Sequence, residues 1–184
     1  MGFILLTAWF AAVNGLEVLC LILSAAAVHE MGHLGMLYLF GADIQTLTIS
    51  VLGAELQADC QRLSYGQELA AVLAGPMMNM ACACLIPFFV TGCEMLVGIH
   101  LVLGGFNLLP IRPLDGGRGL ELFLTWACGP FVGETIACWV SAMTALILAV
   151  LICLLMYATG GSLWLLPAAA GLFGIAGREW FGKR

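Results

Sequence analysis

The sequence predicts an all-α integral membrane protein, with about six transmembrane helices and a short β-like hairpin or loop after the second of them. Of its 184 residues, 62% are hydrophobic and only 9% are charged, so a soluble domain could not cover its surface with polar groups. Stretches such as residues 143–157 hold no charge at all. Polar breaks separate these stretches into lengths near the 20 or so helical residues that cross a bilayer core.

Each predicted element follows from a local pattern. The first candidate span is short for a bilayer, and Asn14, Gly15 and Glu17 separate it from the second. After the second span, residues 44–51 alternate apolar and polar side chains in the manner of a strand, too short and too polar to cross. This strand could pair with an extended substrate or belong to an ordinary solvent-side hairpin, and the sequence leaves both open. The six candidate spans are residues 2–13, 16–40, 67–91, 94–109, 134–157 and 162–176.

The distribution of basic residues gives an independent test of this topology. With six spans, residues 41–66, residues 111–133 and the carboxyl tail share one side of the membrane. All six basic residues fall in these segments: Arg62, Arg112, Arg118, Arg178, Lys183 and Arg184. By the positive-inside rule that side is the cytoplasm, so we expect a multi-pass protein with a cytoplasmic carboxyl terminus. Six basic residues without a stripe also exclude a nucleic-acid partner.

The run HEMGH at residues 29–33 lies inside the second candidate span. Residues four apart share one face of a helix, so His29 and His33 could hold one divalent ion, while Glu30 is rotated aside and can act as an acid or base. Ionisable groups inside a spanning helix are costly to desolvate and indicate a function or a buried partner. HExxH is nevertheless a short pattern that also occurs without a metal.

A second polar motif, NLLPIRPLDGG at residues 107–117, ends the fourth candidate span. Two prolines and two adjacent glycines indicate a broken or distorted helix end that projects polar groups inward. Asp115 is then a candidate third ligand, because catalytic zinc sites commonly combine three protein ligands with one open position. Leu-Asp-Gly-Gly is equally good chemistry for a helix cap or a turn, so both interpretations of Asp115 stay open.

Three ordered motifs, HEMGH at residues 29–33, AGPMMN at residues 74–79 and NLLPIRPLDGG at residues 107–117, resemble those of the site-2 protease family of intramembrane zinc metalloproteases. The layout is most similar to the small type that processes a sporulation sigma factor. The resemblance implies that His29, His33 and Asp115 bind Zn²⁺, that Glu30 is the catalytic acid/base and that Asn107 helps to hold the substrate or the transition state. It also implies cleavage of a membrane-embedded or membrane-associated protein in or near the bilayer of a bacterial cell membrane. The abbreviated first span departs from the family pattern, and it could either alter substrate gating or reflect a trimmed sequence.

Two further polar residues lie in candidate spans. Asn79 could contact substrate, but an asparagine in a spanning helix more often hydrogen-bonds to a neighbouring helix. We interpret His100 as a satisfied or headgroup-level histidine, since no motif requires it.

We expect residues 1–184 to form a single polytopic membrane metalloprotease domain without a PDZ or CBS domain. An alternative function is an ion transporter or channel that uses the intramembrane His, Glu and Asp residues, although no inverted repeat is visible. A zinc-binding scaffold without turnover is disfavoured, because a structural zinc site has no need of Glu30. The sequence leaves the substrate, regulatory membrane partners and homo-oligomerisation open.

Overall fold

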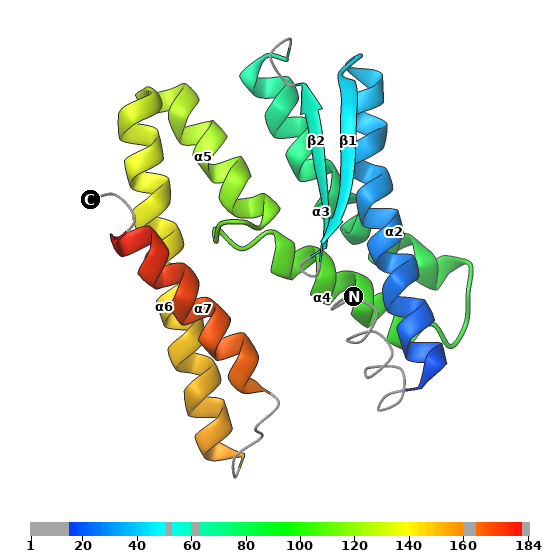
Figure 1. The fold of residues 1–184 in the computed structure, drawn as a ribbon. Helices are drawn as coiled ribbons and strands as arrows, with labels where there is room; N and C mark the ends of the chain where they lie inside the picture. Colours follow the sequence, from blue (N-terminus) through cyan, green and yellow to red (C-terminus); the bar gives the residue numbers. More distant parts are fainter. Residues whose placement is uncertain (1–14, 51–52, 60–62, 160–164, 182–184) are drawn as a thin grey trace. The chain divides into compact units, whose positions relative to one another are not determined.

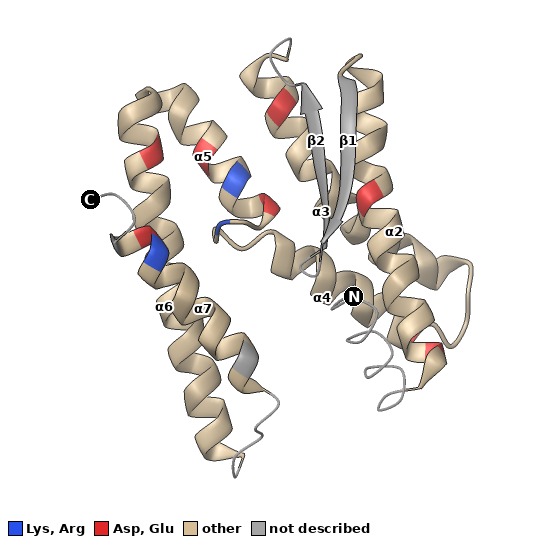
Figure 2. Cartoon of the chain, in the orientation of Figure 1, with Lys and Arg blue, Asp and Glu red and all other residues tan. Residues whose placement is uncertain are grey.

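The computed structural model describes residues 15–50, 53–59, 63–159 and 165–181 (Figure 1). The chain divides into two compact units, Met1–Asn107 and Leu108–Arg184. Figure 2 shows that α2 (Leu16–Leu39), α3 (Tyr65–Leu85) and α6 (Pro130–Ala158) carry few charged residues along their length. The prediction of an all-α membrane protein with a short hairpin is confirmed.

The first unit contains three α-helices, a hairpin and one turn of 3₁₀ helix in its described part. In chain order they are α2, β1 (Asp43–Ser50), β2 (Gly53–Asp59), α3, η2 (Ile86–Phe88) and α4 (Glu94–Asn107). Gly15 (φ +91°) and Gly41 (φ +68°) border α2 with backbone conformations that favour glycine. A capping box begins α3, in which Ser64 and Gln67 each accept a hydrogen bond from the other's backbone N–H.

Glycines bring the three helices of the first unit close together. A Cβ atom added to Gly32 of α2 would lie 2.6 Å from the carbonyl oxygen of Ala74 in α3. One added to Gly104 of α4 would lie 2.5 Å from Cε of Met80 and 3.1 Å from Cβ of Asn79. Such approach is typical of membrane helices, whose association depends on close van der Waals packing instead of the hydrophobic effect.

The strand predicted after the second span is present. β1 and β2 pair antiparallel, with Leu47 opposite Leu56 and Ile49 opposite Ala54, and the register shifts between Ile44 and Thr46. The two strands form a separate two-stranded sheet.

The second unit consists of α5 (Asp115–Cys128), α6 and α7 (Leu166–Phe181) in its described part. Ile111 is fully buried with Ala145 and Ala149 of α6 and Leu172 of α7. The segment before α5 is also fixed by polar contacts at Arg112. Its N–H donates to Oγ of Ser141 at 2.9 Å, and its guanidinium pairs with Glu121 at 2.8 Å and with Glu179 at 3.7 Å.

The side chains of α6 are distributed as in a helix that faces lipid. Its buried positions are mostly small, whereas its large apolar side chains are exposed. The buried alanines are Ala137, Ala142, Ala145 and Ala149, and the exposed side chains include Met143, Ile147, Leu151 and Leu154. A soluble helix would bury the large residues, so this arrangement supports a membrane environment.

Three helices are long and apolar enough to cross a membrane among the described residues: Leu16–Leu39, Tyr65–Phe88 and Pro130–Ala158. α4, with 14 residues, is apolar but shorter. The chain is therefore a multi-pass membrane protein. The first candidate span, residues 2–13, lies outside the described residues.

The structure also contains a helix that the sequence interpretation did not identify. Residues 111–133 were expected to connect two spans after a broken helix end, and α5 forms within them. Gly116 and Gly117 permit this, because a Cβ on Gly117 would lie 2.6 Å from the carbonyl oxygen of Ile111, and one on Gly116 would overlap the carbonyl of Leu108. Gly129, with φ +84°, ends α5, and Pro130 begins α6.

Candidate metal centre

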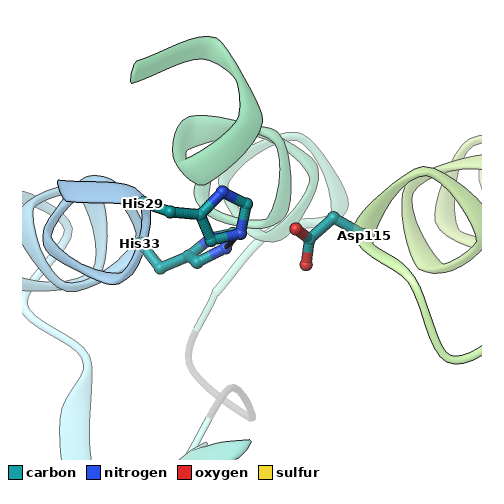
Figure 3. Close-up of side chains that lie close together, drawn as sticks. All are labelled: His29, His33 and Asp115. Carbon is teal, nitrogen blue, oxygen red and sulfur yellow. Dashed lines mark hydrogen bonds between the residues drawn. The ribbon is translucent and has the colours of Figure 1, made fainter. Parts of the chain in front are cut away.

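The two histidines of HEMGH converge on one side of α2. Their Nε2 atoms are 3.2 Å apart, and their rings meet edge to face with centroids 4.8 Å apart. Two nitrogens bound to one tetrahedral zinc at roughly 2.0–2.1 Å lie roughly 3.3–3.4 Å apart, so the observed spacing fits a shared metal ion. Figure 3 shows both imidazoles extending from the same helix.

His33 is oriented by the backbone of α3. Its Nδ1 lies 2.8 Å from the carbonyl oxygen of Ala71, and a carbonyl can only accept, so Nδ1 donates. The ring also packs directly on Gly75, where an added Cβ would overlap the imidazole. The absence of a side chain at Gly75 therefore leaves the space that the ring occupies, and Nε2 of His33 keeps its lone pair for a metal.

His29 is oriented by side chains of α3 and α4. Its Nδ1 lies 3.2 Å from Nδ2 of Asn79, and Oδ1 of Asn79 lies 3.1 Å from Nδ1 of His100. All three residues are buried, with exposures of 6% for His29, 0% for Asn79 and 3% for His100. The expectations that Asn79 hydrogen-bonds to a neighbouring helix and that His100 is satisfied are confirmed. The link from Asn79 to His29 was not anticipated.

The contact between Asn79 and His29 has a counterpart in the spacing of residues in the sequence. Ala71, Gly75 and Asn79 are each four residues apart on α3, as His29 and His33 are on α2. The stripe on α3 therefore supplies a contact to each histidine in turn. His100 and Gly104, also four apart, meet Asn79 from α4.

Glu30 directly follows His29 in α2 and is partly buried. One helical position turns its side chain by about 100° from that of His29, so it does not share the face formed by His29 and His33. A carboxylate beside a histidine pair, but not on the same face, can accept and return a proton.

Asp115 belongs to the second unit and is the first residue of α5 (Figure 3). The N-cap is Leu114, which makes no side-chain capping hydrogen bond, so Asp115 lies in the first turn and not at the cap position. A helix N-terminus stabilises a carboxylate in its charged form, which is the form that binds a metal. Its carboxylate is of the ligand type that the sequence predicts beside the two imidazoles, and its role as a ligand stays a prediction.

Asn107 is the last residue of α4 and is partly buried. Its Nδ2 donates to the carbonyl oxygen of Leu103 at 3.0 Å, one turn back along the helix. This contact holds the amide at the helix end, and the role of Asn107 toward substrate stays a prediction.

Comparison with known proteins supports the interpretation from the motifs. No family model matches the chain. The chain is 28% identical over 138 residues to a zinc metalloprotease of Methanocaldococcus jannaschii, covering 70% of this chain and 40% of that protein. It is also 28% identical over 118 residues to a protein of Synechocystis sp. whose name assigns it to the same class, covering 58% of this chain and 31% of that protein. The chain thus spans less than half the length of either curated relative.

The fold matches that of the site-2 protease from Methanocaldococcus jannaschii, with a TM-score of 0.66 and 22% identity, over 96% of this chain and 85% of that one. The likeness in structure establishes the fold. The sporulation subtype is not addressed by these relatives and stays a prediction.

Proposed function

We propose that the chain is a member of the site-2 protease family, an intramembrane zinc metalloprotease that cleaves a membrane-embedded or membrane-associated protein in or near the bilayer. The observation that carries the proposal is the pair of imidazole Nε2 atoms 3.2 Å apart inside a helix long enough to cross a membrane. A spanning helix tolerates such polar groups where they serve a function.

We propose His29, His33 and Asp115 as the zinc ligands, on the basis of the HEMGH and NLLPIRPLDGG motifs that contain them. Two histidines and a carboxylate form a known catalytic donor set that leaves one position for water or substrate. The contacts of the ring nitrogens support this assignment, because metal-binding histidines almost always use their second nitrogen in a hydrogen bond, as both rings do here. When bound, zinc supplies a Lewis acid that polarises the scissile carbonyl and lowers the pKa of water.

Residues of the chain carry out the proton transfers and bind the substrate. Glu30 takes a proton from the attacking water and delivers it to the leaving amine. Asn107, at the end of α4, holds the substrate or the transition state. An extended segment of substrate pairs with the backbone at an edge of the β1–β2 hairpin. The extended conformation exposes the scissile peptide bond, which the hydrogen bonds of a helix would shield.

The first prediction concerns the proposed ligands. Purified protein should carry about one zinc per chain, as a three-ligand site requires. Replacing His29, His33 or Asp115 by alanine should lower that content well below the parent value, measured by elemental analysis. Glu94→Gln, at an exposed carboxylate that begins α4, is the matched control and should retain zinc. Undiminished zinc in any of the three ligand variants would remove that residue from the set.

The second prediction concerns topology. We propose that the protein lies in a bacterial cell membrane with its carboxyl terminus in the cytoplasm, since all basic residues fall in segments of one predicted side. Reporter fusions after Arg62, after Arg118 and at the carboxyl end should all report the cytoplasm. An external signal from any one of them would overturn the proposed sidedness.

The function itself is tested by incubating the purified protein with candidate single-span substrates, with and without a zinc chelator. Cleavage that stops on chelation and returns with added zinc is the expected result. Zinc-independent ion flux through proteoliposomes without cleavage of any substrate would instead favour the transporter alternative.

A further inference from the structure

A continuous row of hydrogen bonds connects His100 in α4 to the backbone of α3 through both proposed histidine ligands. It runs from Nδ1 of His100 to Asn79, from Asn79 to Nδ1 of His29, and from Nε2 of His29 to Nε2 of His33. The last contact joins Nδ1 of His33 to the carbonyl oxygen of Ala71. Its members come from three helices, and Asn79, which lies between His100 and His29, has no exposed surface.

The carbonyl oxygen of Ala71 can only accept a hydrogen bond, and this determines which atom donates in every other contact of the row. Because the carbonyl of Ala71 accepts, His33 is protonated on Nδ1 and, as a neutral ring, presents a lone pair on Nε2. His29 must then donate from Nε2 to His33 and accept at Nδ1 from the amide of Asn79. His100 in turn donates from Nδ1 to Oδ1 of Asn79. All four contacts are satisfied in a single direction, from α4 toward Ala71.

A zinc ion held by Nε2 of His29 requires the opposite arrangement at that residue. Its Nε2 must present a lone pair, so the proton moves to Nδ1, which then needs an acceptor. The oxygen and nitrogen of an amide have nearly the same shape, so a half-turn of the Asn79 amide places Oδ1 against His29 and Nδ2 against His100. His100 must then accept at Nδ1 and carry its proton on Nε2. His33 keeps its own tautomer throughout.

We propose that Asn79 and His100 are positioning residues for His29, and that metal binding reverses the row of hydrogen bonds from His29 to His100. This inference rests on the proposed zinc site. Asn79 accepts the hydrogen bond from Nδ1–H of His29 when Nε2 of His29 binds the metal. The tautomer of His100 then depends on whether the metal is bound, although His100 does not contact the metal. Groups in this position fix the ring orientation and the tautomer of a metal-binding histidine.

The direct test is nitrogen-15 NMR of the full chain labelled at histidine, in detergent or lipid, with zinc removed and with zinc added. The chain has three histidines, so each ring can be assigned with a single variant per residue. On addition of zinc, His29 and His33 should show coordination at Nε2, while His100 should change from the Nδ1–H to the Nε2–H form. An unchanged His100 beside two coordinated rings would overturn the inference and leave the proposed protease intact. If neither His29 nor His33 responded to zinc, both proposals would fail.

Variants of Asn79 provide a second, independent measurement. Asn79→Leu removes the acceptor for Nδ1–H of His29, and outer partners of this kind typically change metal affinity by about 10- to 100-fold, so zinc affinity should fall by about that much. Asn79→Asp retains an acceptor and should restore affinity to at least the parent value. The readout is competition for zinc with a chelating dye, which needs no substrate.

A matched control comes from another buried hydrogen-bonding side chain. Ser141 is 1% exposed and accepts a hydrogen bond from the backbone of Arg112 in the second unit. Ser141→Ala should leave zinc affinity unchanged even if it lowers thermal stability. A purely structural role for Asn79 predicts that Asn79→Leu behaves like Ser141→Ala, and that result would also overturn the inference.

Discussion

Glu30→Gln should lower the rate of substrate cleavage by about a hundredfold to ten-thousandfold while the protein keeps its zinc and still binds substrate. The substitution preserves the shape of the side chain but removes the carboxylate that we propose accepts a proton from water and returns it to the leaving amine. Single-turnover cleavage of a membrane substrate measures the rate, and elemental analysis of the same sample measures the metal. Glu17→Gln, an exposed residue in the first turn of the same helix, is the matched control and should cleave normally.

Two results would contradict this role. Near-normal cleavage by Glu30→Gln would mean that the chemical step does not use this carboxylate. Loss of zinc together with activity would place Glu30 among the groups that hold the metal, a role that its helical position one residue after His29 does not favour.

Gly75→Ala is expected to have the next largest effect, because one methyl group would occupy the position of the His33 ring. The added Cβ would lie 2.6 Å from Cε1 and 2.7 Å from Cδ2 of His33 and would overlap its Nε2. The ring cannot move without breaking its contacts with Ala71 and His29. Overpacking of this kind costs about 1–3 kcal/mol. If that cost falls on the metal-bound state, zinc affinity should fall by about 5- to 150-fold.

The same helix supplies the control for Gly75→Ala. A Cβ atom added to Gly66 would meet no neighbouring atom within 4 Å, so Gly66→Ala should leave both zinc affinity and cleavage unchanged. Alanine is also the better helix former by about 1 kcal/mol, so neither variant should unfold α3 through backbone preference. Normal zinc affinity in Gly75→Ala would show that the His33 ring is not constrained by α3.

The site was predictable where its residues lie on a single helix. The four-residue spacing of His29 and His33 alone brings their rings together, because helical geometry depends on sequence separation only. The partners of those rings were not predictable, since Ala71 and Asn79 reach them through the packing of a second helix. Spacing showed that Ala71, Gly75 and Asn79 share a face, but not which helix that face contacts.

For the fold as well, features set by a single stretch of sequence were predictable, and features set by tertiary packing were not. Long helices with few charged residues were readily identified, because a bilayer core requires about 20 mostly apolar residues in one continuous stretch. α5 was missed because Pro113, Gly116 and Gly117 are strong helix-breaking signals when only their sequence neighbours are considered. In the structure those glycines instead let the first turn of α5 pack on the preceding backbone from Leu108 to Ile111, a tertiary contact without a sequence signature.

The length of α4 has a consequence for the surrounding lipid. Its 14 residues rise about 21 Å, whereas the hydrocarbon core of a typical bilayer is about 30 Å thick. Such a hydrophobic mismatch is relieved by local thinning of the bilayer, at fractions of a kcal/mol per Å. If α4 crosses the bilayer as the fourth predicted span, acyl-chain length affects the energy of the helix that carries His100 and ends at Asn107, and bilayers of shorter-chain phospholipid should accommodate this helix with less deformation.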